Sequence, residues 1–360
     1  MYRFTFSMII LLLLLATDGY CASGTASGVS NSMNPALSIN GLFKSQYIQH
    51  NNSADDYGIE LQEAEMHFTS VVDPFWKANV IFAVHPEEGQ AEYGICVEEA
   101  SIDALNVPAG FSLKLGKFFV PFGKHAKLHT HAFPFIKAPV AVESFLGEGL
   151  SETGVELTAS LPVPWYSDLT VYGINGNTAI FDNENKELAY GAHSKNFFDI
   201  TYNSTIEIGG SLLSGPASED YYGLKSNMSI IGFDMTYKWI SSKRSHGPAL
   251  TISSEFIMPD FLDDDRTPMG WYAFTQYRFH HNWWIGYTSG LVDCDSEIYP
   301  NAISQGEILE NKMNLTFAPS EFSALRAEVA LYDNQASEED HLCFTLQWNF
   351  TIGSHPAHSY

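Results

Sequence analysis

The chain has 360 residues, of which 18 are Lys or Arg and 42 are Asp or Glu, so its formal net charge is −24. Only 17% of its residues are charged, against roughly 25% in ordinary soluble domains, while aromatic residues reach 14%. This composition excludes a nucleic-acid-binding protein, because no basic surface is available to neutralise phosphates. It also argues against intrinsic disorder, which requires low hydrophobicity and few aromatic rings.

The N-terminus has the features of an export signal. Arg3 precedes an apolar core at Met8–Ala16, and small residues follow at Gly19–Ser23. The apolar run is too short to span a bilayer, and this arrangement is typical of a cleaved secretory signal. We therefore expect a signal peptide over residues 1–22, an N-terminal periplasmic segment over 23–35 and a single domain over 36–360.

Cleavage would leave three cysteines, Cys96, Cys294 and Cys343, far apart in the sequence. Such spacing forms neither a disulfide framework nor a metal-binding motif. At most one pair could form a disulfide, and the sequence does not indicate which pair.

The body of the chain alternates between apolar and polar residues. Between His341 and Ile352 every even position is apolar and every odd position is polar or small. A period of two predicts a β-strand with one apolar face and one polar face. The same pattern recurs at 231–239, 309–317 and 325–331. The phase reverses near Gln62-Glu63 and Glu98-Glu99, which predicts β-bulges at these positions.

Short and long connections alternate between the predicted strands. Short turn signals lie at 73–74, 108–110, 162–164, 203–205, 246–248, 280–282 and 319–320, and longer segments at 50–56, 85–90, 119–150, 177–188, 216–223, 260–267, 293–300 and 333–340. Seven short and eight long connections join about sixteen strands, which is the pattern of an outer-membrane barrel. We predict an all-β fold, a transmembrane antiparallel β-barrel of about sixteen strands. A secreted β-sandwich or propeller is the alternative, but it accounts less well for two loop classes and for aromatic residues at strand ends.

Acidic residues gather in the long connections. Seven of the eight, all except 119–150, carry twenty acidic residues against two basic ones, Lys186 and Arg266. In an even-stranded barrel these loops share the rim opposite the termini, so we expect this rim to face outward. It could bind cations that bridge to anionic lipid headgroups, or the charges could serve only loop solubility.

The long connection at 119–150 differs from the others. It lies largely within a stretch of 39 residues, Ala104 to Val142, that contains no Asp or Glu. A connection of this length is usually functional or disordered, and its Phe content argues against disorder. We predict that it folds into the lumen as a constriction, where amines set a positive potential for passing solutes. The candidate constriction residues are Lys114, Lys117, Lys124, Lys127 and Lys137. The alternative is a lid packed over the mouth of the barrel.

Several short motifs resemble known outer-membrane proteins. Leu115–Gly123 resembles a segment of the phosphate-selective porin O/P superfamily. The segments Val97–Ala100, Leu128–His131, Pro319–Phe322 and Ser354–His358 resemble a group of proteobacterial outer-membrane proteins, some labelled zinc-regulated or TonB-dependent receptors. The porin resemblance implies a sixteen-stranded barrel, usually a homotrimer, whose third extracellular loop folds inward. Phosphate selectivity in that family rests on luminal Arg and Lys, which total only 18 in this chain. A plugged receptor would need a larger barrel than this chain can supply.

Three histidines of the long connection, His125, His129 and His131, suggest a metal site. Neutral imidazole is a good zinc ligand, so zinc is the one cofactor hypothesis, and the acid-free stretch around the three histidines supplies no carboxylate ligand. Alternatively, the three are polar loop residues or pH-sensitive gates. No catalytic motif such as G-x-S-x-G or H-E-x-x-H occurs, so we do not expect an enzyme.

Together these features predict a porin-like channel in the outer membrane of a Gram-negative bacterium, through which small hydrophilic solutes diffuse passively. The expected partners are outer-membrane lipid, lipopolysaccharide, the solutes and further copies of the chain. The alternative is a receptor or binding protein for a metal ion or metal complex, and a third interpretation is a structural or adhesive barrel with a closed lumen.

Overall fold

The computed structural model describes residues 35–51, 54–86, 92–147, 149–178, 180–181, 187–218, 227–241, 247–261, 268–294, 306–334 and 340–353. The expected signal peptide, most of the expected periplasmic segment and the end of the chain lie outside these residues. So do most acidic residues of the long connections, including Asp263–Asp265, so the acidic rim stays a prediction.

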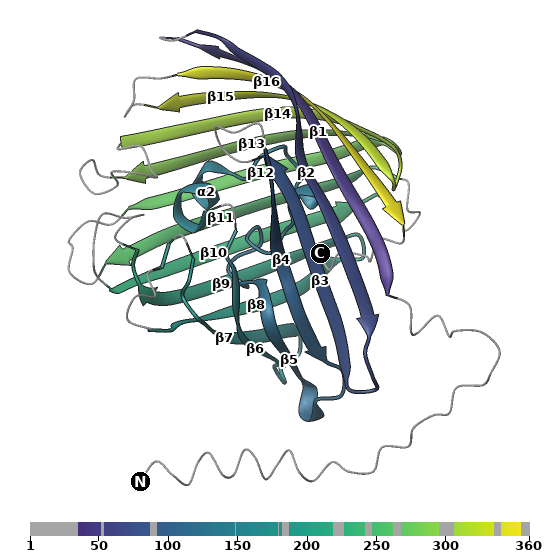
Figure 1. The fold of residues 1–360 in the computed structure, drawn as a ribbon, viewed down its shortest axis with the longest axis vertical. Helices are drawn as coiled ribbons and strands as arrows, with labels where there is room; N and C mark the ends of the chain where they lie inside the picture. The colour runs from purple at the N-terminus through teal and green to yellow at the C-terminus, as the bar shows by residue number, and fades with distance from the viewer. Residues whose placement is uncertain are drawn as a thin grey trace, which may run out of the picture. The chain divides into compact units, whose positions relative to one another are not determined.

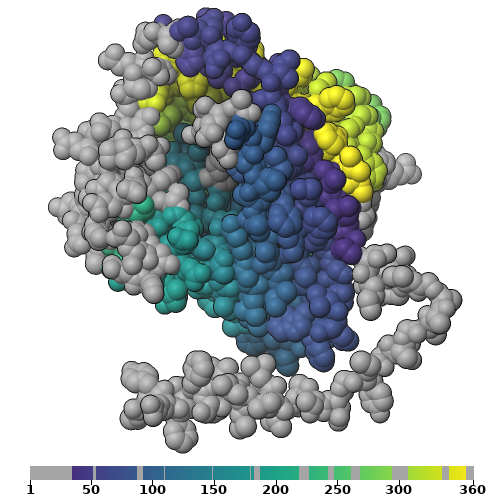
Figure 2. Space-filling view, in the orientation of Figure 1, coloured from purple at the N-terminus to yellow at the C-terminus, as the bar shows by residue number. Residues whose placement is uncertain are grey.

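Sixteen antiparallel strands form one closed barrel, as predicted. Each strand pairs with its neighbours in the sequence, and β1 closes the ring by pairing with β16. Figure 2 shows this closure where the purple strands of the N-terminal part meet the yellow C-terminal strands. The strands are β1 (Ala36–His50), β2 (Asp56–Val71), β3 (Trp76–Pro86), β4 (Tyr93–Ala104), β5 (Phe111–Phe119), β6 (Ser151–Ser160), β7 (Tyr166–Ile174), β8 (Ala189–Thr201), β9 (Ser204–Pro216), β10 (Asn227–Ile240), β11 (Ala249–Phe261), β12 (Met269–His280), β13 (Trp283–Cys294), β14 (Gly306–Ser320), β15 (Ser323–Asn334) and β16 (His341–Gly353).

The strands turn their apolar faces outward. In β16, Phe344, Leu346 and Trp348 are 44%, 48% and 58% exposed, whereas Thr345 and Gln347 between them are buried. A water-soluble barrel would bury the apolar face instead. Exposed apolar side chains around a polar interior are the arrangement of a lipid-facing barrel.

Both predicted bulges are confirmed by the strand register. Leu42 pairs with Glu63 while Phe43 pairs with Leu61, so Gln62 is an extra residue in β2. Glu98 is likewise extra in β4, between residues that pair with Ile81 and Phe82. A bulge interrupts the in-out alternation of side chains and redirects one of them.

The segment 120–150 joins β5 to β6 and is the longest described connection. It contains a 3₁₀ turn, η2 (Thr130–Ala132), and the short helix α2 (Val140–Leu146), which lies against β11, β12 and β13 (Figure 1). None of the helices among the described residues is long and apolar enough to cross a membrane. Cys96 and Cys343 are free thiols.

Candidate pore constriction and metal-ligand cluster

The segment 120–150 lies inside the barrel. Thr130 donates to Glu63 of β2 at 2.9 Å, and Lys124 forms an ion pair with Glu207 of β9 at 2.8 Å. On another side of the ring, Arg326 of β15 donates to the carbonyl of Phe135 at 2.8 Å. A chain segment can reach strands all around a closed ring only from within it. The inward fold of the long connection is therefore confirmed, and we call this segment the inner loop.

The apolar half of the inner loop packs against one part of the barrel wall. Phe122 and Phe145 are fully buried, and α2 contacts β11, β12 and β13. The wall residues of this cluster are Tyr172, Ile174, Ala189, Leu213, Met228, Ile230, Ile257, Tyr272, Val292 and Ile308. Gly232 and Gly270 make room for the two rings, since a Cβ at either glycine would lie within 2.7 Å of one of them. Burial of this apolar surface holds the loop against the wall.

A buried carboxylate fixes the turn at the start of the inner loop. Glu255 accepts hydrogen bonds from the backbone amides of Lys124 and His125 at 3.0 and 2.6 Å, and from the Tyr272 hydroxyl at 2.6 Å. Gly123 has a φ of +57°, and a Cβ there would collide with the Glu255 carboxylate. Only glycine adopts this conformation and leaves this space without cost.

Polar side chains of β14 and β15 hold the middle of the inner loop by its backbone. Arg326 donates to the carbonyl oxygens of Phe133 and Phe135 at 3.0 and 2.8 Å. Lys312 of β14 donates to the carbonyl oxygens of Lys137 and Ala138 at 3.2 and 3.1 Å. Buried carbonyl groups need such partners, so the basic side chains of the wall satisfy a loop without regular structure.

The five candidate constriction lysines lie in different environments. Lys114 and Lys117 are on β5, where Lys117 donates to the carbonyl oxygen of Val97 at 2.7 Å. Lys124 and Lys127 are on the inner loop. Lys137 is exposed, and its contact with Lys312 is through its backbone carbonyl oxygen, not through its amine. The structure therefore does not place the five amines in a single ring.

Lys124 and Lys127 do share one charged region with residues of the wall. Glu207 binds Lys124 at 2.8 Å and Lys195 of β8 at 3.3 Å. Lys127 is close enough to Lys124, Lys195 and Asp234 to interact electrostatically with each of them. Burial, followed by repulsion from the other two lysines, lowers the pKa of Lys127.

In the structure His125 lies in different surroundings from His129 and His131. His125 is buried between the rings of Phe133 and Phe135, with centroid distances of 4.4 and 5.2 Å, and near Tyr272. Burial, with repulsion from Lys312, lowers the pKa of His125 to about 3. The rings of His129 and His131 stack with their centroids 5.8 Å apart.

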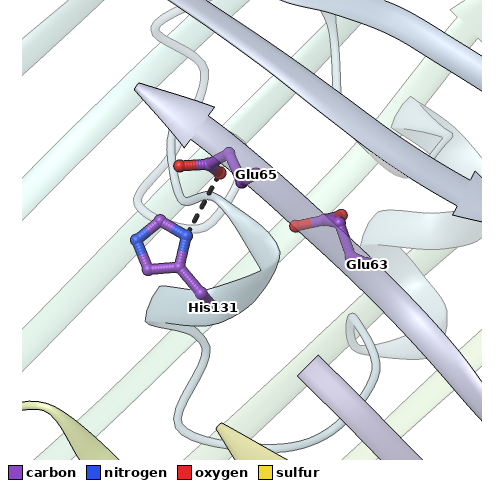
Figure 3. A group of neighbouring side chains, drawn as sticks. All are labelled: Glu63, Glu65 and His131. Carbon is purple, nitrogen blue, oxygen red and sulfur yellow. Dashed lines mark hydrogen bonds and ion pairs between the residues drawn. The ribbon is translucent and has the colours of Figure 1, made fainter. Parts of the chain in front are cut away.

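His129 and His131 meet carboxylates from β2 and β4. Nδ1 of His131 lies 3.1 Å from Oε2 of Glu65, and Figure 3 shows this contact with Glu63 beside it on the same strand. Nδ1 of His129 lies 3.1 Å from the same Glu65 oxygen and 3.0 Å from Oε2 of Glu98. Burial opposes protonation of His129, but hydrogen bonds to the carboxylates raise its pKa well above the usual value. We call these four residues, with Glu63 and Glu99, the histidine–carboxylate cluster.

The sequence does not predict the carboxylates of this cluster, because they lie outside the long connection that carries the histidines. Glu63 and Glu65 lie on one strand and Glu98 and Glu99 on another, and no spacing rule connects them to residue 129. The two predicted bulges were the available signal. They fall at Gln62 and Glu98, and every carboxylate of the cluster lies within three residues of one of them.

No protein-family model matches this chain. An uncharacterised protein of Aquifex aeolicus (strain VF5) is 26% identical over 349 residues, which cover 87% of this chain and 72% of that protein.

Solved structures show the same barrel at low sequence identity. OprB of Pseudomonas putida has a TM-score of 0.62 at 10% identity, with 89% of this chain and 94% of OprB covered. The anion-selective porin of Comamonas acidovorans has a TM-score of 0.59 at 10% identity, with 89% and 100% covered. The trimer form of OmpT, an outer membrane protein of Vibrio cholerae, has a TM-score of 0.55 at 9% identity, with 89% and 100% covered. The chain therefore has the fold of outer-membrane porins, and its resemblance to phosphate-selective porins rests on sequence motifs alone.

Proposed function

We propose that this protein is a channel of the outer membrane of a Gram-negative bacterium, through which small hydrophilic solutes diffuse passively. The observation that carries the proposal is the inner loop, which lies within a closed barrel and is bonded to strands around the ring. An inward loop narrows a water-filled lumen and brings charged groups close to any passing solute.

The two faces of the strands support a transport role. The outward face suits lipid and the inward face is polar, with buried residues such as Asn40, Thr236 and Gln347. The porin fold of the solved neighbours supports a channel function for this barrel.

The charged region around Lys124 and Lys127 is the proposed selectivity element. Lys195 and Lys238 of the wall add positive charge there, while Glu207 and Asp234 offset it. Lysine ammonium groups that are paired with carboxylates in this way still attract anions when the channel is narrow at that point. We therefore expect these lysines to counteract the preference for cations that the acidic residues of the chain would otherwise give the pore.

Single-channel recording in planar lipid bilayers tests the channel. The wild type should give stable conductance steps, and the double variant Lys124→Gln/Lys127→Gln should shift the reversal potential in a salt gradient toward cations. Lys77→Gln, beside the turn between β2 and β3, is the control and should leave the reversal potential unchanged. A folded wild-type barrel that gives no conductance steps would overturn the proposal.

The proposal extends to location and assembly. The signal peptide over residues 1–22 directs export, the outward apolar face contacts outer-membrane lipid and lipopolysaccharide, and the chain assembles as a homotrimer. The trimer form of OmpT supports this assembly. Native mass spectrometry of detergent-extracted protein should give three chains per particle, and a single chain at every concentration would contradict the trimer.

A further inference from the structure

We infer that the histidine–carboxylate cluster binds one divalent transition-metal ion of the zinc type, and that this ion fastens the inner loop to β2 and β4. The site does not depend on the protein being a channel. The ion would be held by His129 and His131 from the loop, Glu65 from β2 and Glu98 from β4, with Glu63 beside them.

Two overlapping groups of donor atoms define the site. Donor atoms of Glu65, Glu98 and His129 all lie within 4.8 Å of one another, as do those of Glu63, Glu65 and His131. Glu65 belongs to both groups, and both histidines approach its Oε2 atom at 3.1 Å. Both histidines therefore converge on one oxygen of Glu65, the residue that the two groups share.

The spacing of these donors suits a small tetrahedral ion. Zinc binds nitrogen and oxygen at about 2.0–2.2 Å, so two ligands of one ion lie about 3.3 Å apart. Nδ1 of His129 lies 3.1 Å from Glu65 and 3.0 Å from Glu98. A ring nitrogen has a single proton to donate, so it cannot serve two carboxylates equally, whereas one ion between the three atoms can bind all of them.

The second nitrogen of His129 faces a further carboxylate. Its Nε2 atom lies 3.7 Å from Oε1 of Glu99, and the other oxygen of Glu99 accepts a hydrogen bond from Asn79 at 2.8 Å. A metal-bound histidine usually directs its other N–H to a carboxylate, which fixes the ring and its tautomer. The edge of the Phe119 ring also packs on His129, at a centroid distance of 4.8 Å.

Charge and burial favour a cation at this cluster. The side chains of Glu65, His129 and His131 are 2%, 8% and 6% exposed, and those of Glu98 and Glu99 are 16% and 12% exposed. With Glu63, the cluster contains four carboxylates and two imidazoles. Even with both imidazoles protonated, two negative charges remain. Burying such a surplus is costly unless cations offset it. A metal-bound imidazole is neutral, so one divalent ion offsets two of the four carboxylate charges, and the neighbouring Lys114, which interacts with Glu99, offsets a third.

The donor set selects the class of ion. Calcium and magnesium prefer a shell made only of oxygen atoms, whereas imidazole nitrogen with carboxylate oxygen suits zinc and its neighbours in the first transition row. Because the nitrogen donors come from the loop and the oxygen donors from the wall, the ion would fasten one to the other.

Zinc titration of the chelator-treated protein in detergent, followed by isothermal titration calorimetry, tests the site. Wild type should bind one zinc ion per chain, and Glu65→Gln and His129→Gln should each weaken binding at least tenfold. His193→Gln is the matched control, since His193 is a buried histidine of β8 that contacts Ser211 and lies outside the cluster. Cobalt offers a second readout, because four-coordinate Co²⁺ absorbs visible light strongly and should lose this absorption in both cluster variants.

Heat-modifiable mobility in gel electrophoresis establishes that each variant retains a folded barrel. The inference is overturned if folded wild type binds no zinc, or if Glu65→Gln and His129→Gln bind zinc as tightly as wild type. Binding that instead disappears on changing His280 and His281, which adjoin at a surface turn, would also overturn it. Conductance is not used in this test, so its outcome is separate from that of the proposed channel.

Discussion

At the scale of single residues, small changes in volume or charge control how the inner loop packs. Gly232 and Gly270 are places where a strand lacks a side chain so that a loop ring can approach. His125 occupies an apolar site among Phe133, Phe135 and Tyr272, although its ring can accept a proton. Each of these residues can be changed without touching the hydrogen bonds between strands.

Gly270→Ala should loosen α2. The added Cβ would lie 2.7 Å from the Phe145 ring and 2.9 Å from the Ala141 Cβ, and overpacking of this kind costs about 1–3 kcal/mol. We expect limited proteolysis within the inner loop to become about 5- to 140-fold faster. Gly210→Ala is the control, since nothing lies within 4 Å of a Cβ there, and equal proteolysis of the two variants would contradict the packing described.

Acid should also loosen the inner loop, through His125. Its pKa is lowered to about 3 in the packed loop, whereas an exposed histidine titrates near 6.5. The packed loop is therefore fully stable above about pH 6.5 and loses stability as the pH falls toward 3, by about 2 kcal/mol at pH 5. Proteolysis by an acid-tolerant protease should accelerate over this range in wild type, and a His125→Phe variant with the same acid response would show that another group is responsible.

At the scale of elements, the loop without regular structure is held by side chains of the wall. The carbonyl groups between Phe133 and Ala138 accept hydrogen bonds from Arg326, Lys312, Asn314 and Gln62. The bulges of β2 and β4 lie on the strands whose carboxylates contact the histidines of the same loop. The barrel wall and the inner loop are thus one structural unit.

Arg326→Leu should release the middle of the inner loop. It removes two hydrogen bonds and leaves the carbonyls of Phe133 and Phe135 without this partner, at about 1–3 kcal/mol for each buried group. In planar bilayers we expect larger and noisier conductance steps. Arg278→Leu is the control, because Arg278 donates to the carbonyl of Gly247 in a turn between strands. Increased conductance noise in both variants would argue against a specific role of the Arg326 hydrogen bonds in holding the inner loop.

At the scale of the whole molecule, the barrel distributes apolar and polar residues in the reverse of the way that a soluble protein does. Apolar residues cover the outside of the strands, and the polar and ionised residues that a soluble protein exposes are buried inside. The low fraction of charged residues in the sequence follows from this division, because half of each strand faces lipid.

Leu346→Arg should destabilise the barrel in lipid vesicles. Leu346 is 48% exposed on the outer face of β16, and an arginine near the bilayer midplane costs about 2–4 kcal/mol. Urea titration of folding into vesicles should give a correspondingly lower free energy of unfolding. Leu346→Ala removes apolar area without adding charge and should cost less, so an arginine variant as stable as the alanine variant would place Leu346 outside the membrane.

The sequence by itself determined the barrel. Alternation with period two, fifteen connections of two lengths and the two phase reversals are local properties, and the sixteen strands and both bulges follow from them. The inward fold of 120–150 could also be predicted, because the absence of acids up to Val142 and the many Phe residues set it apart.

Only the tertiary structure decided which residues meet inside the barrel. It placed His129 and His131 on Glu65 and Glu98, and it moved His125 into an apolar site. It also divided the five lysines among different surroundings. The physical reason is that strand pairing is specified by neighbours in the sequence, whereas the path of the inner loop depends on the combined fit of side chains from many distant strands.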